Sequence, residues 1–425
     1  MATTHGAAAT ATRALKPGHR LTLLKGGTAL FDALVAAVDA ARAEVLLETY
    51  ILAFAGAPLA VVEALERAAL RQVAVHVVVD GIGTGDDIPD EWQRRWRAAG
   101  VQWRVFNPAQ GWRVLLPGRW RRMHRKLCVV DGSVAFCGGI NLLDDYADPT
   151  HGPLDKPRFD FAVRSTGPLV ADTHETMTRL WLRMQVSRDA ENFDLQGARA
   201  AVTAAAHAGT DMVDSEMAAD DLSPATGRAE PAQLAGLVLR DNLRFRRRIE
   251  NFYRYAIGQA RSEIIIANAY FVPGVALQRA LLKAARRGVR ITLLLQGRYE
   301  YFMQHHTSRA MYGTMLDAGI EIIEYEPSFL HAKVAVFDGA QGWLATVGSS
   351  NLDPLSLLLA REANVFVRDD AFAAELRGYL LEAVRAAGAR VEKKAHLARP
   401  LYVRGLSWIA YVAMRFALFA TRNRY

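Results

Sequence analysis

Cysteine is scarce in this chain of 425 residues, which has only Cys128 and Cys137. Both lie in apolar stretches, so we expect two small core residues and no disulfide bond. The sequence also lacks ligand spacings typical of a metal site and the carboxylate clusters that two-metal enzymes use. We therefore expect no metal and no cofactor.

Long uninterrupted apolar runs are also missing. Residues 1–16 are rich in Ala and Thr and have no apolar core of the kind found in secretory signals, so we expect the folded part to stay cytoplasmic. Residues 401–420 are apolar and aromatic but are interrupted by Arg404 and Arg415. An arginine in the middle of a spanning helix costs about 2.5 kcal/mol or more. We expect residues 393–425 to form a helix that lies on a membrane surface, with a spanning helix and a helix packed on the protein as alternatives.

The composition is that of a folded protein with an anionic partner. Hydrophobic residues make up 51% of the chain, enough for two domains with cores of ordinary size. The net charge of +8 favours a phospholipid surface or a nucleic acid and does not choose between them. Residues 190–235 are rich in Ala and then acidic, so we expect a flexible linker there.

One short motif occurs twice in the sequence. His124, Lys126 and Asp131 recur with the same spacing as His331, Lys333 and Asp338. With 11 His, 8 Lys and 25 Asp in the chain, chance produces this triple at a given position about three times in 100,000. Two accidental copies are therefore excluded for practical purposes.

Each copy opens a short apolar strand, residues 127–130 in the first half and 334–337 in the second. Because side chains alternate along a strand, the His and the Lys of each copy face the same side. A histidine can act as nucleophile or as general acid and base near neutral pH, and a neighbouring lysine supplies positive charge. This combination is suited to a phosphodiester.

A glycine-rich segment follows each copy. It contains Gly139 and Asn141 in the first half and Ser349 and Asn351 in the second. Glycine lets the backbone approach a ligand closely, and amide or hydroxyl groups can bind phosphate oxygens. These four residues are our candidates for binding the substrate phosphate.

The repeat extends to the surrounding segments. Residues 44–50 correspond to 263–270, residues 73–81 to 289–297, and residues 99–108 to 318–327. Strands and amphipathic helices alternate in the same order in both halves, which indicates an α/β fold made of two similar domains related by a pseudo-twofold axis. We place these domains at residues 20–189 and 236–392, after an N-terminal tail of residues 1–19.

The duplicated motif resembles the signature of the phospholipase D superfamily, and the segments around Gly139 and Asn351 resemble the bacterial cardiolipin synthases, among them the B type. The resemblance covers about residues 20–367 and implies two phospholipase D-type α/β domains, each a mixed sheet flanked by helices, with one active site at their interface. The second copy departs from the first by three extra residues between Asp338 and Gly348, for which we expect a longer hairpin turn.

The resemblance also implies roles for the motif residues, which we count as candidate catalytic residues. One histidine, by analogy His124, would form a phosphohistidine, and the other would protonate the departing alcohol. Asp131 and Asp338 would fix their loops. An acidic residue further along would orient each histidine, which points to Glu362 for His331 and Asp160 for His124.

The implied reaction transfers a phosphatidyl group from phosphatidylglycerol or phosphatidylethanolamine to phosphatidylglycerol, on the cytoplasmic face of the bacterial inner membrane. The implied partners are these phospholipids and the membrane surface, and no nucleic acid. A hydrolase or another phosphatidyltransferase is the main alternative, since water can release the same intermediate. A nuclease of the same superfamily and a non-catalytic membrane scaffold are less favoured, because the chain is duplicated and all six motif residues are present.

Overall fold

The computed structural model describes most of the two repeated halves. The described residues are 15–85, 88–108, 121–148, 151–191, 233–241, 245–299, 302–353 and 360–394, with Gly405, Trp408, Ile409 and Val412. Most of the expected linker and most of the expected C-terminal helix lie outside them, and the ends of the expected linker belong to a helix and a strand. Within the described part, no helix has both the length and the apolar character needed to cross a bilayer.

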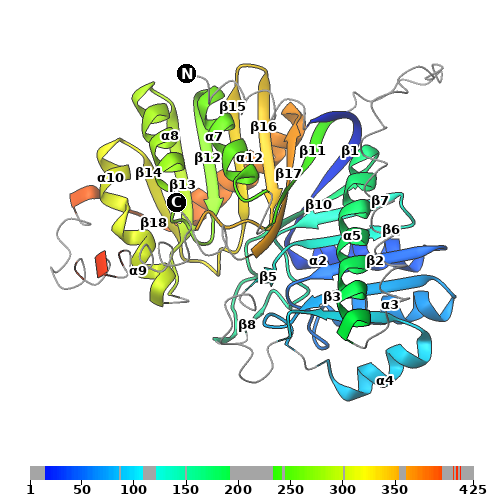
Figure 1. Ribbon diagram of the computed structural model, residues 1–425. Helices are drawn as coiled ribbons and strands as arrows, with labels where there is room; N and C mark the ends of the chain where they lie inside the picture. The colour runs from blue at the N-terminus through cyan, green and yellow to red at the C-terminus, as the bar shows by residue number, and fades with distance from the viewer. Residues whose placement is uncertain are drawn as a thin grey trace, which may run out of the picture.

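The first half alternates strands and helices, as expected from its sequence (Figure 1). Its elements are β1 (Lys16–Lys25), α2 (Gly26–Asp39), β2 (Glu44–Thr49), α3 (Leu59–Leu70), β3 (Ala74–Asp80), α4 (Asp90–Ala99), β4 (Gln102–Phe106), β5 (Arg122–Met123), β6 (Lys126–Val130), β7 (Val134–Gly138), β8 (Ala147–Asp148), β9 (Gly152–Pro153), β10 (Phe161–Thr166) and α5 (Pro168–Glu191).

The second half repeats this order. Its elements are β11 (Gln233–Arg240), α7 (Arg248–Gln259), β12 (Ala260–Asn268), α8 (Val275–Arg286), β13 (Arg290–Gln296), α9 (Phe302–Ala310), α10 (Tyr312–Asp317), β14 (Glu321–Tyr325), β15 (Lys333–Gly339), β16 (Gly342–Gly348), β17 (Ala360–Arg368), α12 (Asp370–Ala386) and β18 (Gly388–Arg390). Strands β2, β3 and β4 thus correspond to β12, β13 and β14. The α/β class and the internal repeat are confirmed.

The two mixed sheets are joined edge to edge. In the described residues the strand order is β18-β14-β13-β12-β15-β16-β17-β11-β1-β10-β7-β6-β2-β3-β4, so the order in one half mirrors that in the other about the β11–β1 pair. In each half three parallel strands lie beside an antiparallel hairpin, β6–β7 or β15–β16. The pairing of Lys16 with Ala235 and of His19 with Gln233 makes the join.

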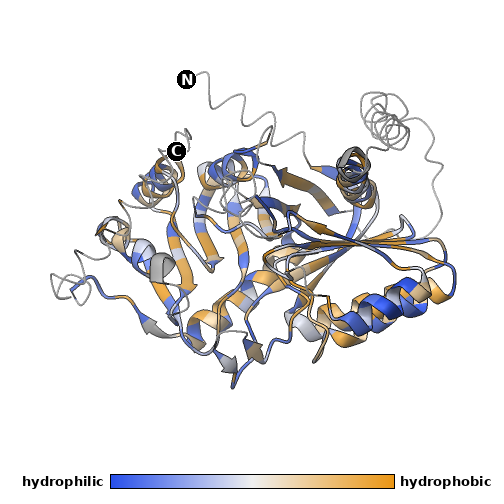
Figure 2. Ribbon diagram, turned by 60° about the horizontal axis from the view of Figure 1, so that its bottom comes forward, coloured by the Kyte–Doolittle hydropathy of each residue, from blue (hydrophilic) through white to orange (hydrophobic). Residues whose placement is uncertain are grey.

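Helices cover the sheet because its strands are apolar on both faces. In the first half α2, α3 and α4 share one core with strand residues such as Val45 and Val77, and in the second half α7, α8 and α10 share another with Ile264 and Leu293. Residues of α5 and α12 belong to a third core that contains strands of both halves. Figure 2 shows the mainly apolar strands beside helices with polar and apolar stripes.

The two motif hairpins differ in length, but not as the sequence suggested. The expectation of a longer turn around Ala340 is wrong. The ladder of β15 and β16 continues to the pair Gly339–Gly342, which leaves only Ala340 and Gln341 in the turn. The three extra residues lengthen the strands, from five residues in β6 and β7 to seven in β15 and β16. Both cysteines are buried and free, as expected.

Candidate active site

The two histidines lie where strands of one half meet strands of the other. Strand β5, which ends just before His124, pairs with the start of β17, and the His124 N–H donates to the Arg361 carbonyl at 3.0 Å. In the same way, the His331 N–H donates to the Phe159 carbonyl at 3.0 Å. The backbone of each histidine is therefore held by the opposite half.

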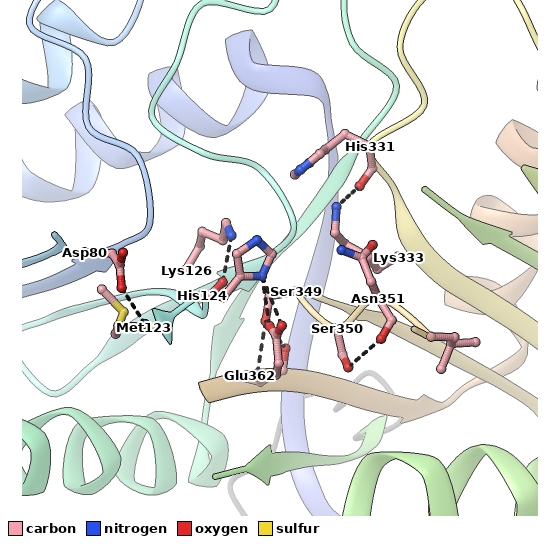
Figure 3. A network of polar contacts seen from close by, with 12 residues as sticks. Asp80, Met123, His124, Lys126, His331, Lys333, Ser349, Ser350, Asn351 and Glu362 are labelled. Carbon is pink, nitrogen blue, oxygen red and sulfur yellow. Dashed lines mark hydrogen bonds and ion pairs between the residues drawn. The ribbon is translucent and has the colours of Figure 1, made fainter. Parts of the chain in front are cut away.

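Each histidine side chain is also held by the opposite half. Nδ1 of His124 lies 3.1 Å from Oε2 of Glu362, and Nδ1 of His331 lies 2.6 Å from Oδ2 of Asp160. The pairing expected from the sequence, Glu362 with His331 and Asp160 with His124, is wrong. Glu362 follows Arg361, whose carbonyl accepts the N–H of His124, and Asp160 follows Phe159, whose carbonyl accepts the N–H of His331. Both pairs therefore join one half to the other. Either half alone lacks one member of each pair, and Figure 3 shows the pair of His124 and Glu362.

The two lysines are buried beside the histidines. Lys126 is 6% exposed, and its ammonium donates to the His124 carbonyl at 2.7 Å. Lys333 is fully buried, and its ammonium donates to the His331 carbonyl. Burial lowers the pKa of Lys126 from 10.5 to about 7, because removal from water disfavours the ammonium.

The two acids have opposite pKa shifts. Burial raises the pKa of Asp160 to about 7, against the opposing effect of the Lys333 charge. Burial also acts to raise the pKa of Glu362, but His124, Lys126 and the Ser349 hydroxyl outweigh it and the pKa is lowered. Glu362 is thus a carboxylate at neutral pH, whereas Asp160 titrates near neutrality.

Both histidines have lowered pKa values. Burial is the largest cause for His124, and Lys126 and Lys333 add to it while Glu362 opposes it. The pKa of His331 lies well below 6.5, because of burial first and then the charges of Lys333, Lys126 and His124. Charges of one half therefore act on the histidine of the other, which places both motif copies in one electrostatic site.

The glycine-rich segments lie next to the acids. A Cβ added to Gly139 would lie 2.4 Å from Oδ1 of Asp160, so only glycine leaves room for this carboxylate. At the equivalent position in the other half, the Ser349 hydroxyl donates to Glu362. The Gly139 N–H is already bonded to the Phe161 carbonyl at 2.9 Å. Gly139 and Ser349 thus contact the two acids, and their predicted role in binding the substrate phosphate stays a prediction.

The two asparagines, unlike Gly139 and Ser349, have side-chain atoms without a partner in the described part of the chain. The side-chain oxygens of Asn141 and Asn351 are buried and have no hydrogen-bond partner among the described residues. Asn351 is 3% exposed, and Figure 3 shows it next to Lys333. An unpartnered amide oxygen accepts a hydrogen bond and so fits a ligand hydroxyl, whereas the Nδ2 N–H groups of the same side chains are the donors that a phosphate oxygen needs.

The two motif aspartates lie away from the histidines. The Asp131 carboxylate accepts the backbone N–H groups of Arg42, Ala43 and Glu44 at 2.8–2.9 Å, at the start of β2. The Asp338 carboxylate accepts the Ser262 hydroxyl. Strand β6 lies between Asp131 and His124, and its five residues alone span roughly 16 Å. Asp131 thus fixes backbone N–H groups and Asp338 binds a side-chain hydroxyl, each at the end of its strand away from the histidine.

Comparison with known proteins assigns the family. Residues 34–149 and 253–383, more than half of the chain, match the family model described as "Cardiolipin synthase, PLD-like domain". Cardiolipin synthase B of Escherichia coli (strain K12) is 37% identical over 365 residues, which cover 86% of this chain and 80% of that protein. This chain belongs to the phospholipase D-like cardiolipin synthase family. As a member of this family it is an enzyme.

More distant relatives agree. Cardiolipin synthase A of Pseudomonas fluorescens (strain SBW25) is 30% identical over 360 residues, covering 85% of this chain and 67% of that protein. Phosphatidylserine synthase of Haemophilus influenzae Rd KW20 has the same fold, with a TM-score of 0.66 at 12% identity and coverage of 97% of this chain and 99% of that one. The duplicated phospholipase D-type fold is confirmed.

The structure adds to this cardiolipin synthase site a residue that sequence reasoning missed. The ring of Tyr50, at the end of β2, meets the imidazole of His124 edge-on with ring centroids 4.8 Å apart, and the Lys126 ammonium lies 5.2 Å from its centre. Tyr50 could have been found from the repeat, because Tyr270 occupies the corresponding position after β12.

Proposed function

We propose that this enzyme is a cardiolipin synthase which transfers a phosphatidyl group to phosphatidylglycerol through a phosphohistidine intermediate. The observation that carries the proposal is the pair of crossed contacts, His124 with Glu362 and His331 with Asp160. They create one site with two imidazoles, two buried lysines and two differently charged acids. Such a site can perform two successive substitutions at phosphorus.

The difference between the acids supports a division of roles. Glu362 is anionic and holds Nδ1–H of a neutral His124, which leaves Nε2 with a free lone pair for attack on phosphorus. The pair of His331 and Asp160 titrates near neutrality through its carboxyl group and can carry one proton. Paired groups with diverging pKa values separate base from acid. We therefore assign His124 as nucleophile and His331 as general acid.

The first step forms the covalent intermediate. Nε2 of His124 bonds to phosphorus of the donor lipid, the bond from phosphorus to the departing alcohol breaks, and His331 gives that alcohol a proton. In the second step His331 takes the proton of the acceptor hydroxyl, the new phosphorus–oxygen bond forms and the phosphorus–nitrogen bond breaks. Lys126, Lys333, Asn141 and Asn351 bind the non-bridging oxygens and stabilise the charge of the transition state.

The donor would be phosphatidylglycerol or phosphatidylethanolamine, with glycerol or ethanolamine as the released alcohol. We propose that the enzyme acts on the cytoplasmic face of the inner membrane as a peripheral protein. The exposed side chains of Trp408, Ile409 and Val412, which are 64%, 62% and 40% exposed, support contact of the C-terminal segment with lipid. We also propose the two predicted domains, 20–189 and 236–392, with the difference that β1 begins at Lys16, α5 ends at Glu191 and β11 begins at Gln233, so each domain extends a few residues beyond these limits.

Expression of the chain in bacteria that lack cardiolipin tests this function. Lipids are analysed by mass spectrometry beside the variants His124→Asn and His331→Asn. We expect cardiolipin only with the parent chain. Phosphatidic acid in its place would show a hydrolase, and unchanged lipids would contradict the assignment.

A further inference from the structure

Asp80, at the end of β3, holds the backbone next to His124. Its side chain is fully buried. Oδ2 accepts the N–H of Met123 at 2.7 Å (Figure 3). Oδ1 accepts the N–H groups of Ile82 and Gly83 at 2.9 and 3.2 Å. A carboxylate that accepts three backbone N–H groups compensates for part of the loss of water, and it fixes the peptides that donate them.

The second half contains the same arrangement with a different side chain. Oε1 of Gln296, at the end of β13, accepts the N–H of Leu330, the residue before His331, at 3.3 Å. The glycines that follow Asp80 and Gln296 confirm that the positions are equivalent. Gly81 donates to the Phe106 carbonyl at 2.9 Å, and Gly297 donates to the Tyr325 carbonyl at 3.0 Å.

These contacts complete the fixation of each histidine. The N–H of the histidine binds the opposite half, whereas the N–H of the preceding residue binds its own half. The two successive peptide groups on either side of the residue before each histidine are thus restrained, and their rotation would move Nε2 relative to phosphorus. In the first half the same turn also supports Tyr50, since a Cβ at Gly83 would lie 2.2 Å from the Tyr50 carbonyl oxygen.

We propose that Asp80 and Gln296 are a pair of positioning residues, each of which sets the orientation of one catalytic histidine through the N–H of the residue before it. The inference rests on the proposed function, because it assumes that both histidines take part in the reaction. No hydrogen bond joins either residue to an imidazole among the described residues, so both position the histidines through the backbone; the charge of Asp80 also acts to raise the pKa of Lys126, and only the exchange of the backbone N–H groups separates the two effects. A reactive group displaced by about 1 Å can lose roughly 100-fold in rate.

Asp80→Asn tests the first contact. The Asn amide has only one acceptor oxygen, and the N–H groups of Ile82 and Gly83 both bind to it. The amide NH₂ then faces the N–H of Met123, and because both groups are donors, this hydrogen bond is lost. We expect kcat for phosphatidyl transfer to fall roughly 10- to 100-fold with KM unchanged. The turn and the fold are retained.

Gln296 allows a test with a matched rescue. Gln296→Met keeps the length of the side chain and removes the acceptor, so kcat should fall by a similar factor. Gln296→Glu restores an acceptor oxygen and should keep kcat within about threefold of the parent. Glu263→Gln is the control. Glu263 is a buried carboxylate near the start of β12 that binds Arg290 and Arg377, whereas the site lies beside the other end of this strand, where Asn268 pairs with Lys333. The control variant should lose thermal stability and keep kcat.

Hydrogen exchange of the full chain provides a second measurement that does not depend on turnover. The peptides that contain Met123 and Leu330 should exchange faster in Asp80→Asn and Gln296→Met, respectively, and at the parental rate in the control. Parental kcat in both variants, or an equal loss of kcat in Gln296→Glu, would overturn the inference. If the parent enzyme itself forms no cardiolipin, the proposed function fails; faster exchange confined to these peptides would still support the backbone contact.

Discussion

Replacement of Lys126 by methionine should stabilise this protein while it destroys activity. The lysine is almost fully buried, and its pKa falls from 10.5 to about 7 on folding. The difference of 10.5 − 7 = 3.5, at about 1.4 kcal/mol for each pH unit, corresponds to a cost on the order of 5 kcal/mol for a charged ammonium in the folded state. Methionine has a similar shape and no charge.

Only part of this cost can be recovered. The His124 carbonyl would lose the donor that now lies 2.7 Å away, which costs about 1 kcal/mol. Glu362 and Asp160 would lose the attraction of a nearby cation, since both act to raise the pKa of Lys126. We therefore expect the free energy of unfolding to rise by about 1–2 kcal/mol near neutral pH.

The gain should depend on pH in a defined direction. Because the folded-state pKa of Lys126 lies below its unfolded value, the folded state binds fewer protons between pH 7 and pH 10.5. The penalty is complete below pH 7 and disappears as the pH rises through this range. The advantage of Lys126→Met over the parent should be largest at about pH 6 and smaller at about pH 9.

Urea unfolding at these two pH values measures the effect, and phosphatidyl transfer is measured on the same samples. We expect activity to fall roughly 100- to 1,000-fold, because the ammonium no longer stabilises the charged transition state. Lys25→Met, at a lysine that is 41% exposed, is the control and should change stability little. A Lys126→Met variant that is less stable than the parent at about pH 6, or an advantage that does not shrink with rising pH, would refute the reasoning.

Three further predictions concern the acids. Glu362→Gln should lower kcat by roughly 1,000-fold or more, because the amide no longer fixes the tautomer of His124; ¹⁵N NMR of the imidazole reports the tautomer, and an unchanged kcat would contradict the role. Ser349→Ala removes a hydrogen bond that lowers the pKa of Glu362, so the acid limb of the kcat/KM profile should move to higher pH; a shift to lower pH would contradict the assignment. Gly139→Ser should lower activity roughly tenfold or more, since its Cβ would displace Asp160, and parental activity would show that the carboxylate can move freely.

Much of the fold could be predicted from the sequence, because it depends on local patterns. Strand β6 and the first part of β15 are short apolar runs that can be read directly from the sequence. The segments around β2 and β12 resemble each other, and the elements that follow them occur in the same order in both halves. The join of the two sheets at β1 and β11 depends on edge pairing between distant strands, which no local pattern specifies. The sequence also does not show whether Gly339 and Gly342 form the last pair of the β15–β16 ladder or lie in the turn, so the length of the second hairpin was predicted wrongly.

Most members of the site were predicted, but its connections were not, and Tyr50 and Asp80 were missed. The spacing of the motif and the repeat identified both histidines and both lysines, and the resemblance identified both acids. Which acid meets which histidine follows from the pairing of β5 with β17 and of Phe159 with Leu330 across the two halves, and the sequence carries no signal for it. Asp80 was missed for another reason: an Asp-Gly step after a strand is typical of a turn, and only its contact with Met123 reveals more.

The crossed pairs explain how a duplicated chain can divide two roles between two copies of one motif. A symmetric site would give both histidines the same pKa and the same support, whereas the reaction needs one free base and one proton carrier. The halves differ at the acid, Glu362 against Asp160, and at the position beside it, Ser349 against Gly139. The hydroxyl of Ser349 helps to lower the pKa of Glu362, and no hydroxyl is present at Gly139 next to an acid whose pKa is raised. Since each acid serves the histidine of the opposite half, a change beside an acid in one half alters the chemistry of the other, and the two copies must diverge together.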